Sequence, residues 1–410
     1  MVDKNLFLHD FAVVAILKNE GHYLKEWLDY HLLAGVDHFY LYDNDSTDNQ
    51  AAVAAPYVEA GLVDYFPTPG KVMQLIAYND AVKRLKFQCR YMAFIDGDEF
   101  IYPKTTRSIV EVVDEILSRD TNAAGLAVNW QCFGSNGQEK ADFSRGVLER
   151  FTRRAPSNWT RSTAPSGNEL IKTLANPRMI SHIINPHFAF YFEGVFAVNE
   201  NGSFVQNAFN EPVTADKIVV NHYFTKSHEE YLQKMNRGRS DILSKRSEEN
   251  FNSHDRNEVF DDGILNYRAA RAENFSFESE ADKLNRVTEA LTDTLTAYAD
   301  GAKFSVETAL TCRAVSSYLL EKFPRDADVW QICEEASLDA ILKSLHGMRL
   351  AEARLLIREL PKLLRLPYPA VNDLRGVSLQ VISQVMDAMH LNNMWSGYVE
   401  LDYIRDMLED

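Results

Sequence analysis

The sequence has little cysteine, no long apolar run and a shortage of positive charge. Its 410 residues include only four widely spaced cysteines, Cys89, Cys132, Cys312 and Cys333. Their number and spacing exclude a disulfide framework and a CxxC metal site. No stretch approaches the roughly 18–20 apolar residues of a membrane-spanning helix. Residues 1–5 (MVDKN) include an acid and no apolar core, so we expect no signal peptide.

The chain is acidic, with 43 basic and 59 acidic residues and a formal net charge of −16. Such a surface repels polyanions, so we expect no nucleic-acid partner. The hydrophobic share of 46% and the charged share of 25% are ordinary for a globular protein. Together with the scarce cysteine, this composition predicts a soluble cytoplasmic protein. Location at the inner face of the membrane is the alternative.

Two patterns divide the chain. Up to about residue 270, apolar runs that read as strands alternate with stretches that read as helices, which predicts an α/β domain with a mostly parallel sheet. We expect strands at 11–17, 38–42, 63–66 and 91–95, and helices at 23–32 and 72–85. Apolar residues at helical spacing then predict an α-helical domain over 278–410.

Acidic residues follow two of the expected strands. Asp96-Gly97-Asp98 comes directly after strand 91–95, and two residues that are two apart on an extended chain point to the same face. Converging carboxylates repel each other, and Mg²⁺ or Mn²⁺ relieves that repulsion, its remaining ligands being waters and substrate phosphates. A solvated turn is the alternative interpretation.

The loop 43–48 is the second acidic strand end, and Lys18-Asn19-Glu20 closes the first strand in the equivalent position. Ligands bind at the carboxyl ends of strands in parallel sheets, so a carboxylate here could accept hydrogen bonds from a nucleotide. Ser46 or Thr47 could instead cap a helix. The two interpretations are compatible.

An ordered series of motifs over residues 10–245 resembles bacterial members of glycosyltransferase family 92 and the related family-2-like domain. The motifs are Lys18-Asn19-Glu20, Glu26-Trp27, Tyr30-His31, Gly35-Val36-Asp37-His38, Tyr42–Asp48, Gln74, Tyr78-Asn79, Phe94–Phe100, Trp130–Gly137, Glu149-Arg150-Phe151, Lys172, His187, Asn221–Ser227, Glu229-Glu230-Tyr231 and Lys234. The resemblance implies a GT-A fold over residues 1–270, with a nucleotide-sugar site and a divalent metal at the D-x-D loop. Residues 278–410 lie outside it.

The same resemblance implies roles for individual residues. Asp98 would bind the metal and act in catalysis, and Asp96 would bridge to metal or ribose. His222 would be the third metal ligand, although a histidine beside Tyr223 could also be a core residue. The nucleotide pocket would be lined by Asn19, Glu20, Asp43 and Asp45.

Glycosyl transfer also requires groups that act on the leaving diphosphate and on the acceptor. Lys226, four residues beyond His222 in a basic segment, is our candidate for a diphosphate contact; an ordinary charged helix surface is the alternative. Asp142 and Glu193 are candidates for the general base that an inverting displacement needs. Trp130 could stack on a sugar.

We therefore expect a metal-dependent, inverting glycosyltransferase that moves a sugar from a nucleotide-sugar, a UDP-sugar being the expected donor. The expected acceptor is a glycan or lipid-linked glycan in cell-surface polysaccharide synthesis. A nucleotidyltransferase that makes activated sugars is one alternative, but residues 11–22 lack its glycine-rich phosphate loop. A non-catalytic glycan-binding or scaffold protein is the other. The helical region could form a homodimer, contact a membrane or bind the acceptor.

Overall fold

The chain divides into two compact units. The computed structural model describes residues 2–160, 167–273, 275–276 and 278–391. Residues His9–Tyr191 and Phe196–Phe277 form one unit, which we call the sheet unit. Residues Met1–Leu8, Phe192–Val195 and Glu278–Asp410 form the other, the helical unit.

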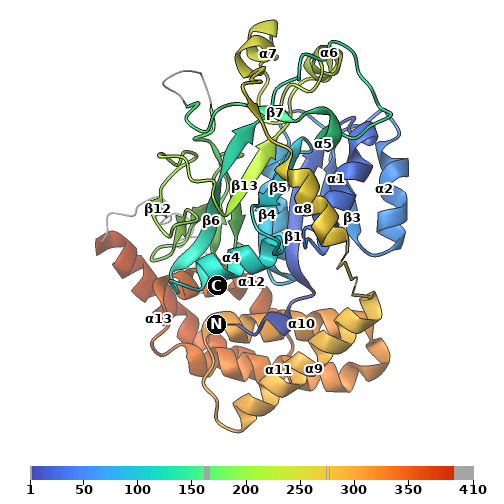
Figure 1. Cartoon of the computed structure of the whole chain (residues 1–410). Helices are drawn as coiled ribbons and strands as arrows, with labels where there is room; N and C mark the ends of the chain where they lie inside the picture. The colour runs from blue at the N-terminus through green and yellow to red at the C-terminus, as the bar shows by residue number, and fades with distance from the viewer. Residues whose placement is uncertain (1, 161–166, 274, 277, 392–410) are drawn as a thin grey trace. The chain divides into compact units, whose positions relative to one another are not determined.

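A ten-stranded sheet lies at the centre of the sheet unit (Figure 1). The strand order is β12-β11-β6-β8-β4-β1-β2-β3, with β13 paired to both β6 and β5. The pairs β1–β2, β1–β4 and β2–β3 are parallel, whereas β8 is antiparallel to β4 and β6. The strands of this sheet are β1 (His9–Leu17), β2 (His38–Asp43), β3 (Val63–Pro67), β4 (Cys89–Phe94), β5 (Glu99–Pro103), β6 (Ala123–Cys132), β8 (Ile171–Ala175), β11 (Phe196–Val198), β12 (Phe204–Val205) and β13 (Ile218–His222).

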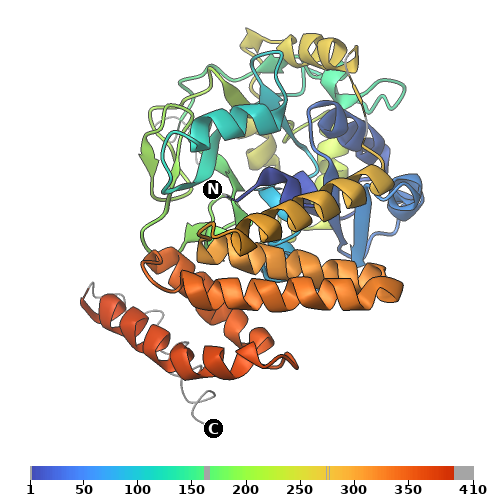
Figure 2. The ribbon, with the colours of Figure 1, turned by 90° about the horizontal axis from the view of Figure 1, so that it is seen from below.

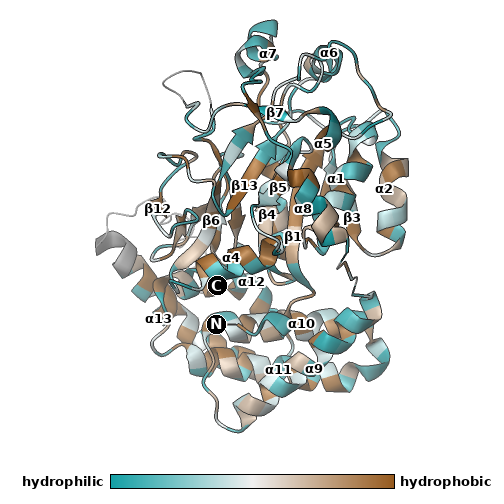
Figure 3. Ribbon diagram, in the orientation of Figure 1, coloured by the Kyte–Doolittle hydropathy of each residue, from teal (hydrophilic) through white to brown (hydrophobic). Residues whose placement is uncertain are grey.

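Helices cover both faces of this sheet, as the continuous apolar runs of its strands predict. On β1, Phe11, Val13 and Ala15 pack into a core that includes Trp27, whereas the alternate side chains pack with Tyr78 on the other face. Figure 3 shows hydrophobic residues following the strands. The helices of this unit are α1 (Gly21–Leu33), α2 (Gln50–Glu59), α3 (Gln74–Leu85), α4 (Ile109–Leu117), α5 (Val147–Arg150), α6 (His228–Arg237), α7 (Glu248–His254) and α8 (Gly263–Ala272).

Small ribbons and short 3₁₀ turns complete the chain. The two-stranded ribbons are β9 (Ile180–His182) with β10 (Phe190–Tyr191), and β7 (Arg153–Arg154) with β14 (Val259–Phe260). The 3₁₀ turns are Lys4–Leu6, Pro177–Met179 and Pro324–Asp326.

The helical unit packs leucine-rich faces together. Figure 2 shows its orange helices running alongside one another, and Leu291, Leu319 and Trp330 belong to one buried core. Its helices are α9 (Glu280–Ala299), α10 (Val306–Lys322), α11 (Ala327–Ser344), α12 (Leu350–Leu363) and α13 (Ala370–Leu391). Among the described residues, none of the helices combines the length and apolar character required to cross a bilayer.

The predicted fold class, an α/β sheet domain followed by helices, is confirmed. The four predicted strands and two predicted helices all form, with ends that shift by about two residues. The strand predicted at 91–95 begins at Cys89 and ends at Phe94. Because β4 ends one residue earlier than predicted, Ile95 lies outside the strand and Asp96 is the second residue after it.

Candidate active site

A cavity that is open to solvent lies at the carboxyl ends of β1, β2 and β4, where ligands bind in parallel sheets. Loops after β1, β2 and β4, the end of β13, helix α6 and the segment after α6 all contribute to its wall. We call it the first cavity. It is lined by Ile16, Leu17, Lys18, Glu20, Asn44, Gln74, Asp96, Gly97, Asp98, Trp130, Pro186, His187, His222, Phe224, Lys234, Arg237, Gly238, Arg239, Ser240, Asp241 and Arg246.

The two aspartates of the D-x-D motif both line this cavity, but they contact different partners. The motif is not the extended strand end that we expected, because a turn closes it: the Glu99 amide donates to the Asp96 carbonyl at 3.1 Å. The alternation of side chains along a strand therefore does not apply between Asp96 and Asp98. The expectation of an extended strand end is wrong, although both carboxylates line the same cavity.

Asp96 is held by two neighbours from other elements. The Gln74 amide donates to one of its carboxylate oxygens at 2.7 Å, and the ammonium of Lys172 lies 2.9 Å from the other. Lys172 is fully buried and also lies 3.1 Å from Glu99. Burial raises the pKa of Glu99 to about 8, although Lys172 opposes the shift. Lys172 is thus a fixed cation that neutralises this side of the motif.

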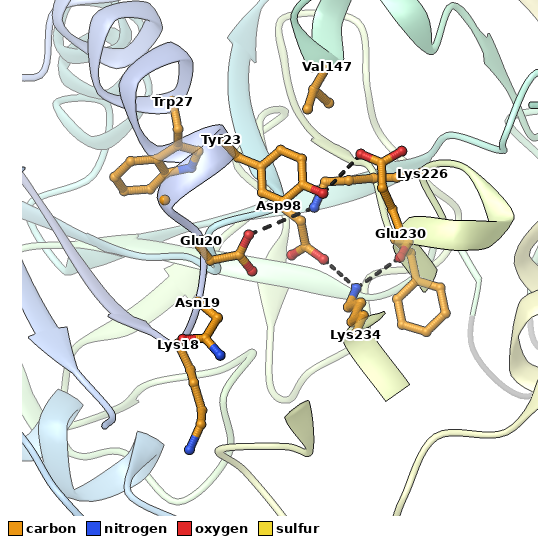
Figure 4. A network of polar contacts seen from close by, with 12 residues as sticks. Lys18, Asn19, Glu20, Tyr23, Trp27, Asp98, Val147, Lys226, Glu230 and Lys234 are labelled. Carbon is orange, nitrogen blue, oxygen red and sulfur yellow. Dashed lines mark hydrogen bonds and ion pairs between the residues drawn. The ribbon is translucent and has the colours of Figure 1, made fainter. Parts of the chain in front are cut away.

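Asp98 is buried and meets His222 and Lys234. Its Oδ1 lies 3.7 Å from His222 Nε2. Its Oδ2 accepts a hydrogen bond from Lys234 Nζ at 2.5 Å, which Figure 4 shows. Burial alone would raise the pKa of Asp98, but Lys234 and His222 outweigh it and hold that pKa well below the usual value. Strand register brings the pair together, since His222 on β13 lies opposite Glu99 on β5.

Helix α6 supplies a row of charged side chains at helical spacing. Glu230, Lys234 and Arg237 are four and three residues apart, so they share one face. Glu230 accepts two hydrogen bonds from Arg150, Lys234 contacts Asp98, and Arg237 contacts Glu20. The Ser227 capping box fixes where the helix begins and hence the phase of this row. In the sequence, Lys234 stands out only as the last motif of the resemblance, and Arg237 does not stand out. Their helical spacing from Glu230 was the available signal.

In an acidic protein, the described residues that line the first cavity include slightly more cations than carboxylates, five against four. Five cationic side chains line it, namely Lys18, Lys234, Arg237, Arg239 and Arg246. Arg237 and Arg239 are paired with Glu20 and Asp241, whereas the Nε of Arg246 is buried without a hydrogen-bond partner. Such a wall suits a multiply charged anion.

A second cavity shares Lys234 and Arg237 with the first. It is lined by Asn19, Tyr23, Thr225, Lys226, Glu230, Gln233, Lys234 and Arg237. Lys226 lines this second cavity and not the first; its ammonium lies 4.0 Å from the Tyr23 ring centre and 3.9 Å from Glu20 (Figure 4). Of the predicted nucleotide-pocket residues, Asn19 also lines the second cavity and Glu20 the first.

Asp43 and Asp45 line neither cavity, because they hold the loop after β2 together. Asp43 accepts hydrogen bonds from the Ser46 amide and the Gln50 side chain, and Asp45 accepts one from the Gly70 amide. The residue between them, Asn44, lines the first cavity instead. The turn at Asp45, whose φ is 57°, is what redirects the loop.

Neither acid predicted as a general base lines the first or the second cavity. The carboxylate of Asp142 accepts hydrogen bonds from Ser144 and Arg145 on an exposed loop. Glu193 belongs to the helical unit, where it pairs with Arg354 at 3.3 Å. Both acids therefore make structural contacts outside the two cavities.

The residues around Asp98 fit a divalent cation only in part. Within the described ranges, no three side chains of histidine, cysteine, aspartate or glutamate form a group that could hold a metal, so the predicted trio of Asp96, Asp98 and His222 does not converge. Asp98 and His222 do meet, and burial lowers the pKa of His222, which leaves the ring in its neutral, ligating form. His222 Nδ1 is buried without a hydrogen-bond partner. Two protein ligands suit Mg²⁺ or Mn²⁺ that receives its other ligands from water and substrate phosphates.

The sheet unit thus has a mostly parallel sheet with helices on both faces and an acidic turn after β4. The chain belongs to glycosyltransferase family 92, whose model matches residues 14–262.

The relatives found by sequence are longer plant proteins. A glycosyltransferase family 92 protein of Ricinus communis is 26% identical over 253 residues, which are 60% of this chain and 41% of that protein. One of Oryza sativa subsp. japonica is 25% identical over 252 residues, or 60% of this chain and 39% of that protein. The chain thus spans about two fifths of the length of these relatives.

Solved structures with some likeness include S. aureus TarS. Its fragment 1–349 is 15% identical, with 82% of this chain and 90% of that chain covered and a TM-score of 0.30. The same fragment in complex with UDP is 13% identical, with the same coverage and a TM-score of 0.31.

Proposed function

We propose that the protein is an inverting glycosyltransferase that moves a sugar from a nucleotide-sugar, a UDP-sugar being the expected donor, to a hydroxyl of a glycan or lipid-linked acceptor. The observation that carries the proposal is the meeting of Asp98 and His222 on a cavity wall that also holds five cationic side chains. Membership of glycosyltransferase family 92 supports it.

The chemistry of the residues that line the first cavity suggests which part of the donor each of them would bind. Asn44, Gln74 and Asp96 offer amide and carboxylate groups for the base and ribose. Lys18, Arg239 and Arg246 can neutralise the diphosphate, whose negative charge grows as the glycosidic bond breaks. Trp130, with His187 at a ring distance of 4.9 Å, offers an apolar face for a sugar ring.

We propose that Asp98 and His222 hold a divalent cation, Mn²⁺ or Mg²⁺, together with the donor diphosphate. When bound, this ion acts as a Lewis acid that stabilises the leaving diphosphate. His222 can serve as a ligand because its ring is neutral, and Asp98 because it stays ionised. Inversion is read from the anomeric configuration of the product by NMR.

Screening nucleotide-sugars with and without Mn²⁺ tests the function. A donor at a hundredfold excess over its Kd stabilises the protein by about 2.7 kcal/mol, which raises Tm by about 5 °C. We expect such a rise for one class of nucleotide-sugar in the presence of Mn²⁺, and release of nucleoside diphosphate when acceptor is added.

The products of the same assay separate the alternatives. A nucleotidyltransferase would release pyrophosphate from a nucleoside triphosphate and a sugar phosphate. A glycan-binding protein would bind the glycan and turn over no nucleotide-sugar with any metal. Either result would contradict the proposal.

Replacing Gly97 tests whether the close packing of the first cavity's wall at this position matters for nucleotide binding. A Cβ at this position would lie 2.8 Å from Leu17 Cδ2 and 3.4 Å from Glu20 Cγ. Because both side chains line the first cavity, Gly97→Ala should displace them and weaken nucleotide binding by about tenfold. Gly376→Ala is the control, since its Cβ would meet nothing within 4 Å. Isothermal titration with UDP measures both; equal affinities would contradict the prediction.

A further inference from the structure

The carboxylate that the proposed metal requires is already paired with a lysine. The Lys234 ammonium lies 2.5 Å from Asp98 Oδ2, and His222 Nε2 faces Oδ1 at 3.7 Å. Asp98 is 6% exposed, so solvent does little to weaken the attraction between the two charges. In this arrangement both oxygens of Asp98 face another side chain.

Lys234 is buried and is held in place by contacts in addition to that with Asp98. It is 7% exposed, and its ammonium donates a second hydrogen bond to the Phe224 carbonyl at 2.9 Å and lies 4.2 Å from the centre of the Phe224 ring. Its other charged neighbours include Lys226 and Arg246, which are cations. Asp98 is thus the anion that compensates this buried charge.

A divalent ion shared by Asp98 Oδ1 and His222 would lie next to the Lys234 ammonium on Oδ2. Because solvent screens charges little in this buried site, the two cations would repel each other strongly. Metal binding should therefore displace Lys234. Lys234 lines both cavities, so it has open space on either side of its present position.

We propose that Lys234 occupies the cation position on Asp98 until the donor arrives, and so makes metal binding depend on the nucleotide. The inference rests on the proposed function, in which Asp98 binds a divalent ion. The donor diphosphate supplies the missing metal ligands and also an anion with which the displaced ammonium can pair. Metal and donor then bind together, and Asp98 is never left as an uncompensated buried charge.

Titration of Mn²⁺ alone, followed by the EPR signal of the free ion, tests this competition. Removing the ammonium in Lys234→Met should tighten Mn²⁺ binding at least about tenfold without nucleotide, whereas UDP should tighten it much more in the wild type than in the variant. Lys234→Gln gives a second measurement if the methionine variant fails to fold, as judged by circular dichroism.

Lys226→Met is the matched control. Lys226 is also buried and also borders the second cavity, but its ammonium faces Glu20 and Tyr23. If the two lysine variants tighten Mn²⁺ binding equally, the effect is a general gain of negative charge, and the proposed competition is overturned.

Asp98→Asn separates this inference from the proposed function. If wild type and Lys234→Met bind Mn²⁺ equally while Asp98→Asn abolishes binding in both backgrounds, the lysine does not compete, but the metal site stands. If no variant binds Mn²⁺ with or without UDP, the metal part of the proposed function fails as well. Tighter binding by Lys234→Met that Asp98→Asn removes supports both.

Discussion

Asp98→Asn is expected to lower glycosyl transfer at least about 100-fold, the loss typical of removing one group that stabilises charge in the transition state. The substitution keeps the size of the side chain but removes the charge that we propose holds the divalent ion. It also deprives the buried Lys234 of its carboxylate, so the cation wall next to the diphosphate is disturbed as well.

The measurement is the initial rate of nucleoside diphosphate release at saturating donor and Mn²⁺, with circular dichroism to verify folding. Asp293→Asn, an exposed acid on α9, is the control for the loss of one negative charge and should keep the wild-type rate. A folded Asp98→Asn protein with unchanged turnover would remove Asp98 from the mechanism.

The positions of the site's loops could be predicted from the sequence because they depend on local patterns. Apolar runs at Phe11–Leu17 and Tyr91–Ile95 identify strands that are buried on both faces, and the polar residues after them must then lie at one edge of a parallel sheet. The resemblance added His222, which the structure places beside Asp98.

The direction of individual side chains could not be predicted, because it depends on turns and register. One hydrogen bond, from the Glu99 amide to the Asp96 carbonyl, closes a turn and separates the contacts of Asp96 from those of Asp98. The φ of 57° at Asp45 likewise leaves Asn44, rather than its acidic neighbours, on the wall of the first cavity.

Contacts between residues that are far apart in the sequence could not be predicted either. Glu193 has an ordinary sequence environment, and only the fold reveals its contact with Arg354 in the helical unit. Lys172 and Asp96 are 76 residues apart, and nothing in the pattern around either residue indicates that β8 brings them together. The row of Glu230, Lys234 and Arg237 is different, because its helical spacing was visible in the sequence.

Among the substitutions considered, breaking the ion pair between Arg150 and Glu230 should have the largest effect on stability. Arg150 donates two hydrogen bonds of 2.8 Å to Glu230, and both side chains are 1% exposed. Among the described residues, the hydrogen-bond donors that Arg150→Met leaves to the buried Glu230 carboxylate are the Ser227 and Tyr23 hydroxyls and the Ser227 amide. Removing one partner of a buried pair costs about 3–5 kcal/mol, so we expect urea unfolding of the sheet unit at a clearly lower concentration, followed by tryptophan fluorescence.

Arg145→Met is the matched control, because it makes the same substitution at a surface pair with Asp142 and should cost less than about 1 kcal/mol. The pH dependence gives a second measurement. Burial opposes ionisation of Glu230, but Arg150 and Ser227 outweigh it and lower the pKa of Glu230 from 4.5 to about 2. The pair therefore stabilises the fold above pH 4.5 and loses this contribution as the pH falls towards 2. Arg150→Met should flatten that acid dependence, and an unchanged pH profile would mean that Glu230 owes its low pKa to other groups.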